Sequence, residues 1–186
     1  TLSVHTPGNL AEAKFGGKPK TVSISPAYAM KNSLLKMAKL KKEQNFEYEI
    51  SYECTHHGPS LDSPAMFIEL GSSLKQWNDI KAAKVVADAA VAAISNPVSS
   101  SVVLGIGGPH YNRKFTNMAL NDQYAFGHII PKYALSTLYP EILKKCINRT
   151  VEPVDSIILD WKGIKSEQKG QLNTILDDLD IHAKKV

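Results

Sequence analysis

Cysteine is scarce in this 186-residue chain, which has only Cys54 and Cys146. The two form no CxxC pair, so the sequence indicates neither a disulfide framework nor a thiolate zinc site and is typical of a reducing compartment. Long apolar runs are also missing, since the longest, 85–94, contains Asp88 and is too short to cross a bilayer. No basic segment followed by an apolar core opens the chain, so nothing indicates secretion. We therefore expect a cytoplasmic protein that does not bind membranes.

Several familiar functional motifs are absent as well. The chain has no GxxxxGK[ST] loop for phosphate, no GxSxG nucleophile elbow and no HExxH zinc motif. The glycine-rich segment 105–115 approaches a dinucleotide fingerprint, but His110 stands where its third glycine should be. Pro109 also removes a backbone N–H that a phosphate-binding loop would use. The chain therefore needs another explanation for its glycines.

What is present is the composition of an ordinary globular protein, with 43% hydrophobic and 22% charged residues. The length suits one domain, 1–186. The chain begins without Met and already in an apolar run, so we expect a further segment upstream. The net charge is +4, and lysines cluster at 14–20 and 36–42. Two interpretations of these clusters stay open: a solvated surface, or a partner rich in phosphate.

Strand and helix patterns alternate along the chain, which predicts an α/β domain with a largely parallel sheet. We expect Ser25 to cap the first long helix and Ser73 to form a capping box with Gln76 at the start of the second. In such folds, ligands bind beyond the carboxyl ends of the strands. The expected strands are 2–5, 21–25, 46–53, 65–70, 101–106, 124–130 and 156–161, and the expected helices are 26–43, 73–95, 140–149 and 166–179.

Four of the six histidines come directly after an expected strand. His5 ends the first strand, His56 and His57 follow the strand from 46, and His110 follows the central strand. Because parallel strands end at one edge of a sheet, we expect these side chains to share a site. Adjacent residues of an extended chain point to opposite faces, so only one of His56 and His57 needs to enter it.

Histidine leaves two chemistries open at such a site. One is a general base that activates water, and the other is a set of neutral imidazoles that hold Zn²⁺. Glu53 and Glu69 are possible carboxylate partners. Glu53 continues an exposed row of carboxylates, whereas Glu69 interrupts an apolar strand, so Glu69 is the better candidate. We expect Cys54 to be a buried wall residue rather than a nucleophile.

The glycine-rich loop could stabilise an oxyanion. Backbone N–H groups of Gly107 or Gly108 would face a carbonyl oxygen, and Arg113 and Lys114 lie near an expected helix start where an anion could bind. A tight turn with two solvated cations is the alternative. If the two cations are close to His110, they should lower its pKa.

Four motifs carry a resemblance to a known family: ECTHHGP, FIELGSS, GIGGPHYNRKFT and GHIIPKYAL. In this order and spacing, and with VHTPGN and LDWKG near the two ends, they resemble the archaeal and plant type of D-aminoacyl-tRNA deacylase. The resemblance implies a three-layer α/β sandwich with a mixed, largely parallel central sheet, similar to peptidyl-tRNA hydrolases and nucleoside phosphorylases. It also implies hydrolysis of the ester between a D-amino acid and the tRNA 3′ end, with zinc as cofactor. Family members carry a further N-terminal stretch, in line with the expected upstream segment.

The resemblance also assigns residues. It makes His56, His57 and His110 the catalytic histidines and candidate zinc ligands, with Lys114 as a further catalytic residue. Pro109 departs from the family pattern, where glycine is expected, and puts the loop conformation in question. We expect a monomer that binds tRNA through Gly107, Gly108, Arg113, Lys18 and Lys20. Two alternatives stay open: another hydrolase or phosphorylase of this fold, such as a peptidyl-tRNA hydrolase, and a non-catalytic, metal-stabilised RNA-binding module.

Overall fold

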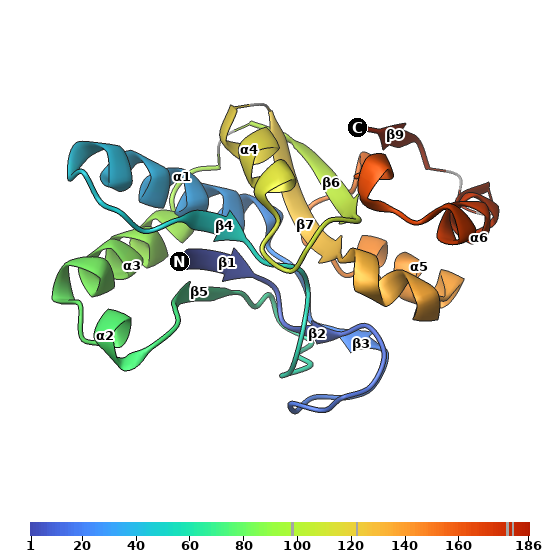
Figure 1. The fold of residues 1–186 in the computed structure, drawn as a ribbon, viewed down its shortest axis with the longest axis horizontal. Helices are drawn as coiled ribbons and strands as arrows, with labels where there is room; N and C mark the ends of the chain where they lie inside the picture. The colour runs from blue at the N-terminus through green and yellow to red at the C-terminus, as the bar shows by residue number, and fades with distance from the viewer. Residues whose placement is uncertain (98, 122, 178, 180) are drawn as a thin grey trace.

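The computed structural model describes residues 1–97, 99–121, 123–177, 179 and 181–186. Strands and helices alternate through most of the chain (Figure 1). The strands are β1 (Leu2–His5), β2 (Gly8–Asn9), β3 (Thr21–Val22), β4 (Ile50–Tyr52), β5 (Phe67–Leu70), β6 (Ser101–Ile106), β7 (Tyr124–Ile130), β8 (Ser156–Leu159) and β9 (Ala183–Lys185). The helices are α1 (Ala27–Glu43), α2 (Leu74–Trp77), α3 (Ile80–Ala93), α4 (Arg113–Asn121), α5 (Pro140–Asn148) and α6 (Ser166–Asp177), with 3-10 turns η1 (Lys132–Thr137) and η2 (Trp161–Gly163).

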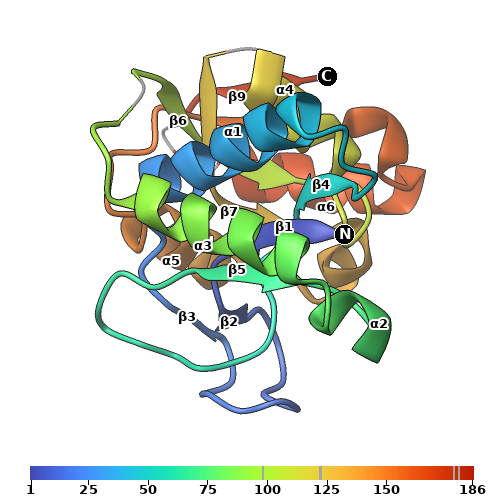
Figure 2. The same cartoon turned by 90° about the vertical axis from the view of Figure 1, so that its left-hand side faces the viewer.

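A four-stranded, fully parallel sheet lies between two helical layers, in the order β7-β6-β8-β9. Side chains of β6 alternate between the layers, as strand geometry requires. Val103 packs into the core beneath α1, α3 and α4, while Leu104 and Ile106 pack into the core beneath α5 and α6. Figure 1 shows the two groups of helices on opposite sides of the strands, and Figure 2 shows α1 and α3 side by side. The predicted three-layer α/β fold is therefore confirmed.

A second sheet, β4-β1-β5, extends this layer. β1 pairs in parallel with β4 and antiparallel with β5, so the sheet is mixed. The chain just after β4 joins the two sheets, because the N–H of Thr55 donates to the carbonyl of Ile129 in β7 over 2.8 Å. The ends of β1, β4 and β6 are thereby drawn toward one place. β2 and β3 form a separate antiparallel pair.

The start of α1 differs from the prediction. Pro26, not Ser25, is the N-cap residue, and it makes no side-chain capping bond. The N–H groups of Ala27 and Tyr28 instead donate to the carboxylate of Glu152, over 3.0 and 3.1 Å. An acidic side chain also complements the positive end of the helix dipole. A distant carboxylate has thus taken the place of the expected local cap.

Two other expected elements are shorter. The helix expected at 73–95 divides into α2 and α3, because the side chain of Asp79 accepts from the N–H groups of Lys81 and Ala82 and starts a new helix. Ser73 Oγ contacts the Gln76 side chain but makes no capping bond to the backbone. The strand expected at 46–53 is reduced to β4. Among the described residues, no helix is long and apolar enough to span a membrane.

Candidate active site

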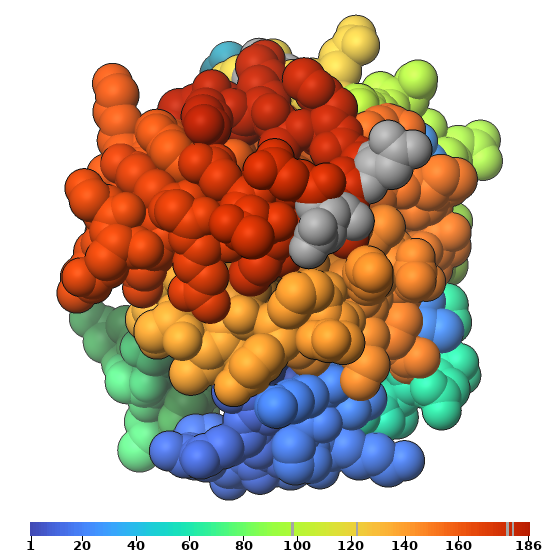
Figure 3. All heavy atoms as spheres, turned by 90° about the vertical axis from the view of Figure 1, so that its right-hand side faces the viewer, coloured from blue at the N-terminus to red at the C-terminus, as the bar shows by residue number. Residues whose placement is uncertain are grey.

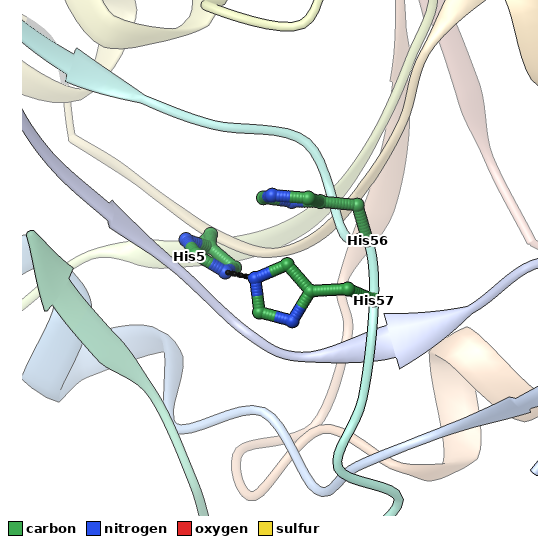
Figure 4. A group of neighbouring side chains, drawn as sticks. All are labelled: His5, His56 and His57. Carbon is green, nitrogen blue, oxygen red and sulfur yellow. Dashed lines mark hydrogen bonds between the residues drawn. The ribbon is translucent and has the colours of Figure 1, made fainter. Parts of the chain in front are cut away.

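Four histidines from three strand ends meet in one cluster. His5 ends β1, His56 and His57 follow β4, and His110 follows β6. The ring of His56 has its centroid 4.2 Å from that of His5, 4.3 Å from that of His57 and 4.4 Å from that of His110. Figure 4 shows how the first three converge. The expectation that these histidines come together is confirmed.

Both members of the His56–His57 pair enter the cluster, so the prediction that they diverge was wrong. The backbone at His57 has a φ of +40°, in the left-handed region, and the chain is not extended there. This turn brings the second ring back to the same side, 5.1 Å from the ring of His5 (Figure 4).

The ring nitrogens of the pair are oriented by the backbone. His56 Nδ1 lies 2.8 Å from the carbonyl oxygen of Cys54, and His57 Nδ1 contacts the carbonyl oxygen of Gly58. A carbonyl only accepts, so both Nδ1 atoms carry the proton and both Nε2 atoms keep a lone pair. His57 Nε2 lies 3.3 Å from His5 Nε2 (Figure 4). This pattern, with one nitrogen held by a carbonyl and a lone pair on the other, is typical of metal-binding histidines.

His5 is the least solvated member of the cluster, with 1% of its surface exposed. Burial, together with the neighbouring His56, lowers the pKa of His5 to about 3. Burial also lowers the pKa of His56. His5 Nδ1 is buried without a hydrogen-bond partner, and its nearest acid is Glu69, whose carboxylate oxygen is 4.0 Å away. Both imidazoles are therefore neutral near pH 7, the form that binds a metal ion.

Glu53 is the main acid of the site, and the prediction that it is exposed was wrong. It is 3% exposed and accepts hydrogen bonds from Ser3 Oγ and, over 2.8 Å, from His110 Nε2. Burial by itself would raise the pKa of Glu53, but these two hydrogen bonds outweigh it and lower the pKa. Its position directly before the Cys-Thr-His-His stretch was the available sequence signal. Alternation hid it, because segment 110–112 pairs with residues 52–54 and brings the His110 ring onto a carboxylate that the pattern placed in solvent.

His110 uses both ring nitrogens on protein partners. Nε2 contacts Glu53, while Nδ1 lies 3.3 Å from Cys54 Sγ and 3.3 Å from the hydroxyl of Tyr133. Hydrogen bonds to Cys54 and Glu53 raise the pKa of His110, although a lowered pKa was predicted. Cys54 is fully buried, as expected for a wall residue.

The two cations expected beside His110 are neutralised elsewhere, which explains that error. Arg113 pairs with Glu49 at the surface, and Lys114 pairs with Asp160 at the end of β8. The catalytic role of Lys114 stays a prediction, and its amine has partners outside the histidine cluster.

The glycine-rich loop turns sharply through Gly107 and Gly108, with φ values of +105° and +75°, and Pro109 follows this turn. The N–H of Gly107 already donates to the carbonyl of Ile130 over 2.8 Å. Gly107 therefore cannot offer its N–H to a substrate without breaking the sheet. Gly108 remains the predicted donor of the pair.

Zinc fits three of these histidines. His5, His56 and His57 form one group whose possible ligand atoms lie within 4.8 Å of one another, and His56 and His110 form another with Cys54. Nitrogens at ~2.0–2.1 Å from a tetrahedral Zn²⁺ stand roughly 3.3 Å apart, which matches the 3.3 Å between His5 Nε2 and His57 Nε2. The expected trio of ligands included His110 in place of His5, but both His110 nitrogens are engaged. The unpartnered Nδ1 of His5, facing Glu69, would complete the outer hydrogen bonding.

A cavity of about 600 Å³ opens beside His56 and His57. Its walls come from residues 8–20 and from η1 and the residues after it. These parts of the chain are in contact, since Lys20 Nζ lies 4.3 Å from the centre of the Tyr139 ring. Figure 3 shows the N-terminal residues, in blue, directly against the orange residues that precede and form α5. Lys20 lines this cavity, and Lys18 lies in the same loop.

Comparison with known proteins gives one consistent result. The profile of the D-aminoacyl-tRNA deacylase family matches residues 1–184. D-aminoacyl-tRNA deacylases of Thermococcus kodakarensis and Pyrococcus abyssi are 43% and 42% identical over 181 residues, which are 96% of this chain and 65% of each relative. That of Methanococcus maripaludis is 35% identical, covering 100% of this chain and 76% of the relative. A crystal structure described as a conserved protein of unknown function is similar with a TM-score of 0.89 and 34% identity, over 99% of this chain and 65% of that one.

Proposed function

The chain belongs to the D-aminoacyl-tRNA deacylase family, and we propose that it hydrolyses the ester between a D-amino acid and the 3′ end of tRNA. The products are the free D-amino acid and the tRNA. The supporting observation is the convergence of four histidines and a buried carboxylate beside a cavity. The chain spans 65% of the length of the first relatives compared, so this activity, tRNA as partner, action as a monomer and a place in the cytoplasm all belong to the proposal.

Zinc is the cofactor that this proposal includes, with His5, His56 and His57 as its ligands. When bound, zinc would lower the pKa of a water molecule so that hydroxide forms near neutral pH. The neutral state of His5 and His56 supports this assignment, because a protonated imidazole has no lone pair to give. The carbonyl of Cys54 orients the His56 ring, and the carbonyl of Gly58 orients the His57 ring.

The Glu53–His110 pair can accept a proton from the attacking water and supply one to the departing 3′ oxygen. The Glu53 carboxylate lies 3.5 Å from His56 Nε2, where it can accept the proton that the attacking water loses. The hydroxyl of Tyr133 contacts His110 Nδ1 and lines the cavity, so it can pass the His110 proton to the departing 3′ oxygen. The bond between the carbonyl carbon and that oxygen then breaks. Glu53 then gives its proton to solvent, and His110 Nδ1 takes up a proton through the Tyr133 hydroxyl, which restores the starting state.

The other predicted site residues have proposed roles in the glycine-rich loop, in stabilising the negative carbonyl oxygen of the ester, or in contact with tRNA. Gly108 remains the proposed backbone donor, since its N–H can face the carbonyl oxygen of the ester as that oxygen becomes negative. Lys114 and Asp160 hold the turn from outside, because Gly107 packs against Asp160. Arg113 lies at the start of α4, where we propose that it contacts the tRNA backbone.

A deacylation assay on matched D- and L-aminoacyl-tRNAs tests the proposal. We expect turnover of the D-ester, loss of turnover with a chelator, and recovery with added Zn²⁺. His57→Ala should lose both bound zinc and activity, while the exposed His182→Ala serves as control and should keep both. Cleavage of peptidyl-tRNA without D-ester turnover would favour another hydrolase of this fold. Binding of tRNA with background turnover would show a non-catalytic module.

A further inference from the structure

The cavity beside the histidines presents more aromatic surface to solvent than a simple hydrolytic site needs. Phe15, Tyr133 and Tyr139 line it and are 81%, 59% and 48% exposed. Exposed aromatic rings grouped around one concavity indicate a binding surface. Tyr133 also contacts the catalytic His110, so the aromatic wall begins at the reacting groups.

The loop that carries Phe15 is held against the paired histidines. The Phe15 carbonyl accepts from the N–H of Gly58, over 3.1 Å, in the residue directly after His57. Asn9 Nδ2 donates to the carbonyl of Gly16 over 2.8 Å. A Cβ on Gly58 would lie only 2.4 Å from the carbonyl carbon of Gly16, so the two backbones meet more closely than a side chain allows. The position of Phe15 is therefore coupled to the site rather than left to a free loop.

Charge distinguishes between possible occupants. Lys20 Nζ lies 4.3 Å from the centre of the Tyr139 ring, so a cation and an aromatic face stand together at the rim. Lys14 also lines the cavity, and its amine lies 3.2 Å from the Glu12 carboxylate, which neutralises the acid of this wall. Aromatic faces stack on nucleobases and cations contact phosphates, and the combination is typical of sites for unpaired nucleotides. An apolar amino-acid side chain would make use of the rings but not of the cation at the rim.

We propose that this cavity binds the 3′-terminal nucleotide of tRNA, with its base stacked against Phe15 and Tyr139 and its phosphate near Lys20. This inference rests on the proposed function, because the ester lies on the ribose of that nucleotide. A base held in the cavity puts its ribose next to His56 and His57. The loop and η1 thereby place the ester, and the histidine cluster carries out the chemistry.

Binding of uncharged tRNA tests this assignment without any turnover. Two tRNAs are compared at one salt concentration, one complete and one lacking only the 3′-terminal nucleotide. We expect the protein to bind the complete tRNA about tenfold or more tightly, the range of one stacked base. Phe15→Ala and Tyr139→Ala should remove most of that difference, while Phe15→Tyr, which keeps a ring, should retain it. Trp77→Ala, at an exposed ring of α2 outside the cavity, is the matched control and should leave the difference unchanged.

Three results separate the possibilities. Equal binding of both tRNAs by the unaltered protein overturns the proposal. So does a change in the relative turnover of large and small D-amino acids by Phe15→Ala without any effect on the binding difference, since the cavity then takes the amino acid. A binding difference that depends on Phe15, in a protein without esterase activity, supports the nucleotide site and refutes the proposed reaction.

Discussion

Acidification should weaken the fold through His128, which supports the histidine cluster through its contact with Thr55. His128 is fully buried in β7 and joins three segments of the chain. Its Nδ1 accepts from the hydroxyl of Thr55 over 3.0 Å, and its Nε2 donates to the carbonyl of Arg149 over 3.2 Å. Thr55 Oγ1 accepts in turn from the N–H of Ile129. Because Thr55 directly precedes His56, protonation of His128 would disturb the chain that positions the cluster.

The magnitude follows from the pKa of this residue. Burial lowers the pKa of His128 from 6.5 to about 4, since the charged ring would lose its hydration. The unfolded chain therefore takes up a proton at a higher pH than the folded protein does. The corresponding stability is complete above the unfolded value and is lost as the pH falls toward about 4. The shift corresponds to about 3 kcal/mol in total, of which roughly 2.5 kcal/mol is lost by about pH 4.5.

Urea denaturation between about pH 7 and pH 4.5 measures this effect, with His128→Gln as the comparison. Glutamine can still donate to the Arg149 carbonyl but does not titrate, so the variant should be less stable at pH 7 and lose less on acidification. His5 and His56, whose pKa values are also lowered, contribute to both proteins and cancel in the difference. Measurements in a chelator keep metal loss out of the comparison. Equal losses of unfolding free energy in the two proteins would refute the reasoning.

Three further changes test the site and its surroundings. Glu53→Gln should lower turnover by about 100-fold, because His110 loses the carboxylate that keeps it protonated. The same change should lower the free energy of unfolding in urea by about 3 kcal/mol. Near-normal turnover would exclude the proposed proton transfers. Gly58→Ala places a Cβ 2.4 Å from the backbone of the neighbouring loop, so KM for D-aminoacyl-tRNA should rise. An unchanged KM would contradict this. Replacing Lys18 and Lys20 with Ala should reduce the slope of log K against log salt by about one unit for each phosphate that a lysine no longer neutralises; an unchanged slope would show that these lysines do not meet the tRNA backbone.

Local sequence patterns predicted a strand or helix best where burial alone produced the pattern. Both faces of β6 are covered, so its continuous β-branched, apolar run marks a central strand. Alternation of strands with helices predicted the parallel sheet, and the position of all four histidines at strand ends predicted that they would meet. The meeting of His5, His56, His57 and His110 was therefore accessible from the sequence.

Where a carboxylate lies far from its partner in the chain, the sequence pattern misled. Glu53 and His110 are separated by 57 positions, and Glu152 caps a helix that begins 125 positions earlier. The alternation of 46–53 shows only that every second residue is polar. It does not predict whether another part of the chain will cover those polar side chains. Burial of Glu53 is thus a property of packing.

The sequence by itself determined the α/β class, the family and the four histidines, because each depends on residue types at short, regular spacings. Only the tertiary structure decided the orientation and the protonation of those histidines. The turn at His57 brings a second ring into the cluster, and the lone pairs that remain on His5, His56 and His57 favour a metal. The contacts of His110 with Glu53 and Cys54 raise its pKa. Hydrogen-bond partners and desolvation set the protonation of each ring, and both arise from residues that are distant in the chain until it folds.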